Sequence, residues 1–341
     1  MRIGNVDTNT GVALIAEIGN NHEGSVGLAE ELIGLAHQSG ADAVKLQTLV
    51  PELFVSKRDP DRLEVMRRFA LPLDETQRLI VEAAKSGIHV FSTPLDLVSA
   101  QALGEVANTF KVSSGDLTFT GLLKMVASYG KDTILSTGAS YLSEVESAVD
   151  QVTGVWGDIG ARPALALLHC VSVYPTAPSS VNLRAMNKLQ FRFPEVSIGF
   201  SDHTVGIGAA AAAVAAGAVI IEKHFTLDKY YSSFRDHALS ADPSELRELK
   251  SRMEDVSVLL GSGEKVPDPA EMENRTLIRR SVSAAIDLPK GHLIQRNDIL
   301  CLRPGAGIPP EQFESLIGRR TTRDLEAGQS LEESGLSWSF T

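Results

Sequence analysis

The sequence is poor in cysteine, has no long apolar run and carries no excess of basic charge. Its two cysteines, Cys170 and Cys301, show neither metal-binding nor redox spacing, so we expect a reducing, cytoplasmic environment. The longest apolar stretch, AAAAAVAAGAVII, is too short to span a membrane, and the N-terminus lacks the basic and apolar regions of a secretory signal. A formal net charge of −11 argues against nucleic acid as a partner, because such binding depends on basic residues. We therefore expect no export, no membrane insertion and no nucleic-acid binding.

What remains is the composition of an ordinary globular protein with a large core. Of the 341 residues, 43% are hydrophobic and 22% are charged, which is far from the composition of disordered chains. The length exceeds that of one usual core, but β/α barrels reach about 250 residues as a single domain. One barrel followed by one small domain is the organisation that fits this length.

Eight short apolar runs alternate with longer segments of helical periodicity, as a parallel sheet with crossover helices requires. The runs are VALIAEIG (12–19), DAVKLQT (42–48), IHVFSTP (88–94), TFKVSS (109–114), DTILSTG (132–138), ALALLHC (164–170), VSIGFSD (196–202) and VIIEKHFT (219–226). Eight is the number of strands that closes a TIM barrel. An open doubly wound sheet is the alternative, but it would leave two edges and usually has fewer parallel strands. The sequence therefore predicts a (β/α)8 TIM barrel.

The predicted barrel ends near residue 265, after a last helical segment, SELRELKSRMEDVSVLLG. The next stretch, SGEKVPDPAEMENR, is polar and contains two prolines, which is typical of a linker. The rest of the chain contains a short strand, SVSAAIDL, and turns such as PKG and RPGAGIPP, with little helical periodicity. We predict a catalytic barrel over residues 1–265, a linker over 266–280 and a small β-rich domain over 281–341.

Two lysines lie inside runs that should be apolar if the strands are buried on both faces. They are Lys45 in DAVKLQT and Lys111 in TFKVSS. Hydroxyl groups end the neighbouring strands, at Thr93, Ser113, Ser136 and Ser201. Because active sites of β/α barrels lie at the carboxyl ends of the strands, these groups predict a cradle for a phosphate or carboxylate. The alternative is structural, with Lys45 and Lys111 simply paired with Glu17 and Asp116.

Two histidines come at the ends of adjacent strands. His203 follows the seventh run and His224 closes the eighth, and an acid precedes each of them within two residues, Asp202 and Glu222. This arrangement favours a divalent metal site with open positions for a substrate oxygen. The alternative is a pair of hydrogen-bonded structural histidines.

Other candidate features are weaker. His22, in the first loop after a strand, His169 and His237 are each interpreted as possible pocket residues or as packed side chains. The segment GIGAAA (206–211) matches a dinucleotide-binding pattern, but SDHTV separates it from its strand. We interpret its glycines and alanines as permitting close packing of a helix on the barrel.

The ordered motifs resemble one family. AEIGNNHEGS, AVKLQT, FSTP, FKVSSGD, ILSTG, LLHCVSVYPT, IGFSDHT and IIEKHFTLD resemble those of the sialic acid synthase family, and ILCLRPGAGIPPEQFESLIG resembles its antifreeze-like SAF module, a β-clip fold. The resemblance implies condensation of phosphoenolpyruvate with an open-chain N-acetylmannosamine-like amino sugar, with release of phosphate and formation of a nine-carbon keto acid. It also implies a divalent cofactor, Mn²⁺ before Mg²⁺ or Co²⁺, and a domain-swapped homodimer.

The resemblance assigns a role to each matching position. Catalytic roles fall on Glu17, Lys45, Lys111, Asp116 and Glu222. Phosphoenolpyruvate would bind at Lys45, Thr93, Lys111, Ser114, Ser136 and Ser201. The sugar would contact Gln47, Asp116, Ser172, Tyr174, Asp236 and Arg303, the last reaching the partner's barrel. The metal ion would be held by His203 and His224.

Departures from the family pattern leave the sugar open. Asp116 stands where many bacterial sialic acid synthases have Glu, Ser172 stands where they have Asn, and the loop over 49–63 is shorter. Legionaminic-type, pseudaminic-type and spore-coat sugar acids are alternatives, with or without a phosphate on the sugar. A seven- or eight-carbon keto-acid phosphate synthase is a further alternative, but such relatives lack the C-terminal module. A carbohydrate- or ice-binding protein with an inactive barrel is the non-enzymatic alternative.

Overall fold

The computed structural model describes residues 1–338 and divides the chain into two compact units, residues 1–261 and 262–341. The division lies four residues before the boundary that we predicted at residue 265. The last three residues of the predicted small domain, 339–341, lie outside the described residues.

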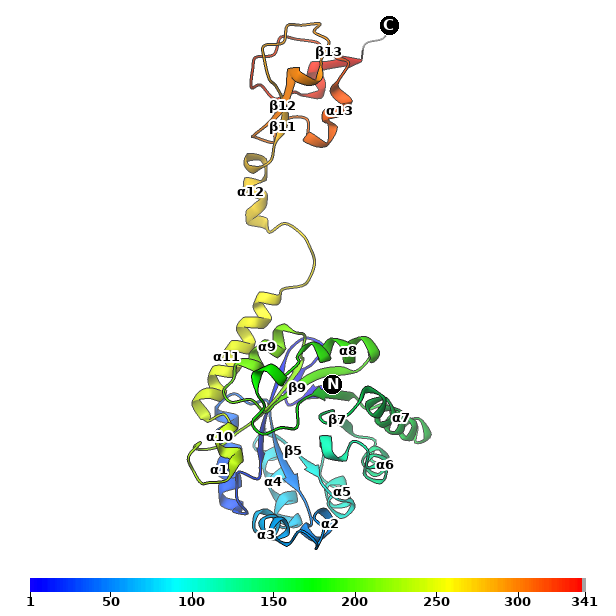
Figure 1. Ribbon diagram of the computed structural model, residues 1–341, viewed down its shortest axis with the longest axis vertical. Helices are drawn as coiled ribbons and strands as arrows, with labels where there is room; N and C mark the ends of the chain where they lie inside the picture. Colours follow the sequence, from blue (N-terminus) through cyan, green and yellow to red (C-terminus); the bar gives the residue numbers. More distant parts are fainter. Residues whose placement is uncertain (339–341) are drawn as a thin grey trace. The chain divides into compact units, whose positions relative to one another are not determined.

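The first unit is a closed barrel of eight parallel strands, and this confirms the predicted TIM barrel (Figure 1). The strands are β3 (Ala13–Gly19), β4 (Ala43–Thr48), β5 (His89–Pro94), β6 (Thr109–Val112), β7 (Asp132–Ser136), β8 (Leu165–His169), β9 (Ser197–Asp202) and β10 (Ile220–His224). Closure comes from β10, which pairs in parallel with both β9 and β3. The open doubly wound sheet is therefore excluded.

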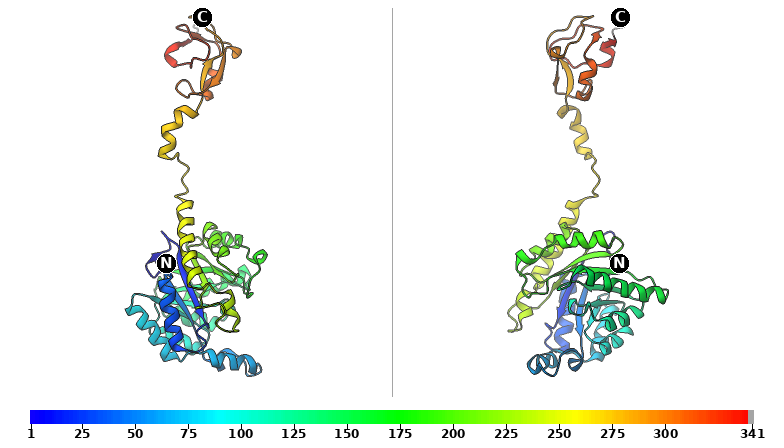
Figure 2. Two further views of the ribbon diagram at one scale, coloured as in Figure 1. Left: turned by 90° about the vertical axis from the view of Figure 1, so that its left-hand side faces the viewer. Right: turned by 45° about the vertical axis from the view of Figure 1, so that its right-hand side comes forward.

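Helices form an outer layer around the strands, as the two further views in Figure 2 also show. The crossover helices are α1 (Val26–Gln38), α4 (Leu73–Lys85), α5 (Leu97–Gly104), α6 (Thr120–Ser128), α7 (Leu142–Asp158), α8 (Arg184–Arg192), α9 (Gly208–Ala215) and α11 (Pro243–Leu260). Short helices α2 (Pro51–Phe54), α3 (Pro60–Phe69) and α10 (Arg235–Leu239) lie in loops that follow strands. Helix α9, which contains much of the GIGAAA segment, packs on β9, β10 and α11, in agreement with the close-packing interpretation.

The interior of the barrel contains an apolar layer, and its buried charged side chains lie toward the carboxyl ends of the strands. Side chains on one strand alternate between faces, so Ala13, Ile15 and Glu17 of β3 all point inward. The first two belong to an apolar inner cluster with Phe91 and Ile134, to which Ile3 of the hairpin β1 (Arg2–Ile3) and β2 (Val6–Asp7) also belongs. Polar residues occupy inward positions at both ends of the strands, and at the amino ends Thr109 Oγ1 lies 3.3 Å from His89 Nε2. The buried lysines and glutamates, Lys45, Lys111, Glu17 and Glu222, lie toward the carboxyl ends.

The second unit is small and rich in antiparallel strands, as predicted. Its elements are α12 (Pro269–Ile278), β11 (Ser281–Ala284), β12 (Ile299–Leu302), α13 (Phe313–Leu316), β13 (Arg319–Thr321) and β14 (Leu336–Trp338). Strand β11 pairs with β12, and β13 pairs with β14. The unit has its own apolar cluster, which includes Val282, Leu316 and Leu331.

The segment predicted as a linker contains a helix, α12. Its start is well specified: Asp268 accepts a hydrogen bond from the Ala270 N–H, Pro269 is the first helical residue, and Glu271 completes a capping box. None of the side chains of α12 is buried. This helix was missed because end signals, and not an apolar face, specify it.

None of the helices within residues 1–338 is long and apolar enough to cross a membrane.

Candidate active site

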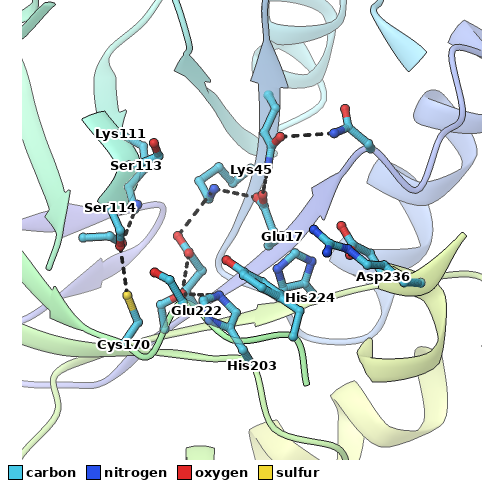
Figure 3. Close-up of a pocket in the computed structure, with 18 of the residues that line it drawn as sticks. Glu17, Lys45, Lys111, Ser113, Ser114, Cys170, His203, Glu222, His224 and Asp236 are labelled. Carbon is cyan, nitrogen blue, oxygen red and sulfur yellow. Dashed lines mark hydrogen bonds and ion pairs between the residues drawn. The ribbon is translucent and has the colours of Figure 1, made fainter. Parts of the chain in front are cut away.

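A cavity of about 730 Å³ opens at the carboxyl ends of the barrel strands. Six strands supply polar lining residues, with Glu17 from β3, Lys45 and Gln47 from β4, Lys111 from β6, Ser136 from β7, Ser201 from β9, and Glu222 and His224 from β10. Residues that follow the strands complete the lining, namely Ser114, Cys170, Ser172, Tyr174 and His203, and Figure 3 shows the cavity. The predicted strand-end residues are thus largely brought together in one site.

Lys111 lies at the hydroxyl-rich end of the cavity. Its ammonium group donates hydrogen bonds to Ser136 Oγ at 2.6 Å and to the Val112 carbonyl at 3.1 Å, and burial lowers its pKa. The structural alternative, a pair with Asp116, is not formed. Asp116 instead accepts a 2.5 Å hydrogen bond from Ser113 Oγ, and it lies outside the lining of this cavity as the described residues define it.

Ser114 marks the same end of the cavity. Its Oγ accepts a 2.9 Å hydrogen bond from the Gly138 N–H and lies 3.1 Å from Cys170 Sγ (Figure 3). A Cβ on Gly138 would lie within 2.9 Å of Ser114 Oγ and Cys170 Sγ and 2.4 Å from Ser172 Oγ, so only glycine lets these three side chains converge. Hydroxyl donors and a buried ammonium group together form an anion-binding surface.

Lys45 sits between two buried carboxylates. Its Nζ lies 2.8 Å from Glu17 Oε2, 3.8 Å from Glu222 Oε2 and 3.2 Å from Thr93 Oγ1. The structural pair with Glu17 is therefore present, and Thr93 accepts a hydrogen bond from Lys45. Burial opposes the charge on Lys45, but Glu17 and Glu222 outweigh it and raise the lysine pKa.

The two carboxylates have different electrostatic environments. Burial raises the pKa of Glu17, and the nearby Glu222 raises it further. Burial also acts on Glu222, but Lys111 and Lys45 outweigh that effect and lower its pKa. Glu222 Oε1 accepts a 2.8 Å hydrogen bond from Ser201 Oγ, whereas its buried Oε2 has no hydrogen-bond partner. Glu17 is thus the carboxyl that protonates more readily, and Glu222 the one that stays ionised.

His203 and His224 face each other with ring centroids 5.5 Å apart. The Nδ1 of His203 lies 2.8 Å from the Val171 carbonyl, which can only accept, so Nδ1 carries the proton and Nε2 is left with a lone pair in the neutral ring. Burial lowers the pKa of both histidines. The Nδ1 of His224 is buried without a hydrogen-bond partner. Both rings are therefore neutral and can offer a nitrogen lone pair to a metal ion. His224 in addition has a buried ring nitrogen without a hydrogen-bond partner.

These two rings are not part of a larger ready-made ligand set. Within residues 1–338, no group of three or more His, Cys, Asp or Glu side chains is placed to hold a metal ion. The ring of Tyr174 packs 4.2 Å from that of His203 and 6.0 Å from that of His224. An ion held here would have two imidazole ligands and take its other ligands from water or substrate.

Two of the remaining predicted residues, Gln47 and Asp236, also line the cavity. Gln47 donates a 2.9 Å hydrogen bond to Glu17 Oε1, and this bond connects strands β4 and β3. Burial raises the pKa of Asp236, whose Oδ1 lies 3.3 Å from Arg235 Nε. Arg303 belongs to the second unit, where its side chain is exposed.

The sequence did not predict the residues that the loops after β4 and β10 add to the cavity lining. Residues 49–63 were interpreted as a short loop, yet they contain α2 and the start of α3. The lining residues from these helices are Phe54, Arg62, Val65 and Met66, and Phe234 and Arg235 line the cavity at the start of α10. The start of α3 does have a sequence signal, since Asp59 caps it and Pro60 is its first residue.

The three weaker histidine candidates lie outside this cavity lining, as far as the described residues define it. His22 Nδ1 accepts a 3.1 Å hydrogen bond from the Gly24 N–H. The Nε2 of His169 lies 2.8 Å from the Val181 carbonyl. His237 lies between Thr226 and Glu23, with ring nitrogens 2.7 and 3.2 Å from their oxygens. All three are buried, packed side chains.

Comparison with known proteins agrees with this fold. The chain is 39% identical to the N,N'-diacetyllegionaminic acid synthase of Legionella pneumophila, over 93% of this chain and 92% of that protein. It is 31% identical to the human N-acetylneuraminate-9-phosphate synthase, over 94% of this chain and 91% of that protein. A crystal structure of N-acetylneuraminic acid synthetase from Leptospira borgpetersenii superposes with a TM-score of 0.74 at 33% identity, covering 80% of this chain and 94% of that one.

Family matches divide the chain much as the structure does. Residues 32–265 match the NeuB family and residues 279–337 match the SAF domain. The NeuB match spans more than half of the chain and most of the barrel. The chain therefore belongs to the NeuB family and carries a SAF domain after its barrel.

Proposed function

We propose that the protein is a nonulosonic acid synthase that condenses phosphoenolpyruvate with an open-chain amino sugar and water and releases phosphate. The observation that carries the proposal is the single cavity in which two buried lysines, two buried carboxylates and two neutral histidines meet. The names of the relatives, all sugar-acid synthases, support the same class of reaction.

Phosphoenolpyruvate would occupy the end of the cavity formed by the lysines and hydroxyls. Lys45 and Lys111 supply charge to its phosphate and carboxylate, and Ser114, Ser136 and Ser201 supply hydrogen bonds. Burial of both lysines strengthens these interactions, because the local dielectric is low. Thr93 would act through Lys45, to which it is hydrogen-bonded.

His203 and His224 would hold Mn²⁺, or Mg²⁺ or Co²⁺ in its place. The fit rests on the unsatisfied, buried Nδ1 of His224 and on the neutral state of both rings, which is the form that binds metal. When bound, the ion would polarise the aldehyde oxygen of the sugar as a Lewis acid.

The two carboxyl groups suit different proton-transfer steps. As C3 of phosphoenolpyruvate bonds to the aldehyde carbon, positive charge develops at C2, where water adds before phosphate leaves. Glu222 stays ionised and has one oxygen without a hydrogen-bond partner, so it would orient that water and accept its proton. Glu17, with its raised pKa, would supply the proton that the sugar oxygen takes up.

The wall formed by α2, α3 and the segment before α10 would bind the sugar. Phe54, Val65, Met66 and Phe234 give it an apolar character that suits N-acyl methyl groups and a deoxy carbon. We therefore propose a diacylamino deoxy sugar, as the name of the Legionella relative suggests for that protein. A phosphorylated sugar is the second candidate, because Arg62 lines the same wall without an acidic partner in the described residues.

The family resemblance further suggests a homodimer. In this proposal the SAF domain of one chain carries Arg303 to the sugar end of the partner's cavity.

A phosphate-release assay tests the proposed reaction. The protein, loaded with Mn²⁺, is incubated with phosphoenolpyruvate and with N-acetylmannosamine, its 6-phosphate, or a 2,4-diacetamido-2,4,6-trideoxy sugar. We expect release of phosphate and formation of a keto acid with at least one sugar, and the highest kcat/KM with the diacetamido sugar. A folded, metal-loaded sample that is inactive with every sugar would refute the proposed function.

A further inference from the structure

A second buried ion pair lies directly behind the two histidines and outside the chemistry proposed so far. Lys223 Nζ lies 3.1 Å from Asp202 Oδ2, and both side chains are completely buried. The two residues are direct partners in the parallel pairing of β9 with β10. Neither lines the cavity as the described residues define it.

The pair faces the opposite side of the strands from the candidate ligands. Ser201 on β9 and Glu222 and His224 on β10 line the cavity. Side chains alternate along a strand, so Asp202 and Lys223, at the intervening positions, point outward into the apolar layer beneath the helices. Burial of two charges there is expensive, and an apolar pair of similar size often gives equal or greater stability. Stability alone therefore does not account for this pair.

Its hydrogen bonds hold the backbone of Thr204, the residue that follows His203. The Asp202 Oδ1 accepts a 2.8 Å hydrogen bond from the Thr204 N–H, and Lys223 Nζ donates a 2.6 Å hydrogen bond to the Thr204 carbonyl. His203 lies between these two bonded residues, and His224 follows Lys223 directly. The side chains of Asp202 and Lys223, together with the backbone of Thr204, thus connect the chain segments that carry the two candidate ligands.

His224 depends on this connection more than His203 does. The His203 ring is oriented by the Val171 carbonyl, whereas no hydrogen bond to the His224 ring is found in residues 1–338, and its Nδ1 is unsatisfied. The position of the His224 ring is therefore set by its backbone, which is tied through Lys223 to the loop that carries His203. A shift between these segments would change the distance between the two imidazoles.

We propose that Asp202 and Lys223 are positioning residues that fix the spacing of His203 and His224 and so set the affinity of this site for a divalent ion. The inference rests on the metal site of the proposed function. Groups that hydrogen-bond to metal ligands typically alter metal affinity about 10- to 100-fold when they are replaced, and we expect an effect of that order for this connection through the backbone.

Mn²⁺ titration of the full-length protein, followed by calorimetry and by the EPR signal of free Mn²⁺, tests the inference. The variant carries Asp202→Asn and Lys223→Met together, so no single buried charge is left unpaired. We expect about 10- to 100-fold weaker Mn²⁺ binding, recovery of kcat at high Mn²⁺ and an unchanged KM for phosphoenolpyruvate. If the double variant fails to fold, the single variant Asp202→Asn, which preserves the shape of the side chain, takes its place. It should also bind Mn²⁺ more weakly than the wild type.

A matched ion pair at the other end of the barrel serves as the control. Lys250 Nζ lies 2.7 and 2.9 Å from the two oxygens of Asp42, which precedes β4. The variant Asp42→Asn with Lys250→Met should lose stability but keep the Mn²⁺ affinity of the wild type. If the folded Asp202 and Lys223 variants bind Mn²⁺ as tightly as the wild type, the inference is overturned but the proposed function is not. Absence of Mn²⁺ binding by the wild-type protein would overturn both the inference and the metal part of the proposed function.

Discussion

The site owes its chemistry to individual charged residues that the barrel removes from water. Glu17 and Glu222 are both buried carboxyls beside Lys45, yet their pKa values shift in opposite directions. The difference arises because Lys111 adds its charge to that of Lys45 near Glu222, whereas burial dominates at Glu17. Two carboxyls with separated pKa values can serve as an acid and a base in the same cavity.

Replacement of His203 by Ala should abolish turnover while the protein stays folded. Loss of one of two imidazole ligands removes the Lewis acid, which contributes several kcal/mol, so we expect kcat/KM to fall by about 100-fold or more. Steady-state kinetics and circular dichroism check this result. His89 lies at the start of β5, at the opposite end of the barrel, and His89→Ala should leave kcat/KM nearly unchanged. Normal activity of the His203 variant would contradict the metal assignment.

His22 should make the protein less stable in acid. Burial lowers its pKa from an ordinary 6.5 to about 4, so the unfolded chain binds a proton that the folded chain rejects. Stability from this residue is thus intact above pH 6.5 and decreases as the pH falls from 6.5 toward 4, by up to about 1.4 kcal/mol per pH unit.

Urea unfolding of the wild type and of His22→Asn at several pH values measures this effect. Asn can still accept the hydrogen bond from the Gly24 N–H but does not titrate in this range. As the pH falls from 6.5 toward 4, the unfolding free energy of the wild type should decrease more than that of the His22→Asn variant. Parallel profiles would mean that His22 binds its proton equally in both states.

At the level of elements, the strands were predictable and the loop helices were not. Each barrel strand is a short apolar run buried on both faces, and its polar end residues, such as Lys111 and His224, break that pattern visibly. Helices α3 and α12 lack such a pattern, and capping residues specify their starts. An apolar side chain in a loop, such as Met66, looks like any core residue until the cavity it lines is known. The lysine- and histidine-lined end of the cavity could therefore be predicted from the sequence, and the lining residues of α2 and α3 could not.

Helix α3 should determine the affinity for the sugar and not that for phosphoenolpyruvate. Met66→Gln keeps the length of the side chain but puts a polar group on the apolar wall. Loss of one apolar contact worth about 1–2 kcal/mol should raise the KM for the sugar about 5- to 30-fold and leave the KM for phosphoenolpyruvate unchanged.

The control for this prediction is Leu53→Gln on the neighbouring helix α2. Leu53 is 57% exposed and does not belong to the cavity lining found in the described residues, so both KM values should stay at the wild-type level. An equal rise of both KM values in the Met66 variant would indicate a general distortion of the cavity.

At the level of the whole molecule, the two units are built as separate bodies. The barrel has its outer and inner apolar clusters, and the SAF domain has a cluster of its own around Val282 and Leu331. Residues 262–268, between α11 and α12, are exposed and contain no helix or strand. In the proposed homodimer, such a linker would let the SAF domain of one chain reach the barrel of the other.

Mixing two inactive variants should restore activity if Arg303 acts on the partner's barrel. Arg303→Ala has an intact cavity but lacks the arginine, and His203→Ala has the arginine but an inactive cavity. In an equimolar mixture refolded together, half of the dimers are mixed, and each mixed dimer has one complete site, so about one quarter of wild-type activity should return. If Arg303 serves the cavity of its own chain, no mixed dimer contains a complete site, and the mixture should remain as inactive as its components. The phosphate-release assay, with each variant refolded alone as its control, separates these two results.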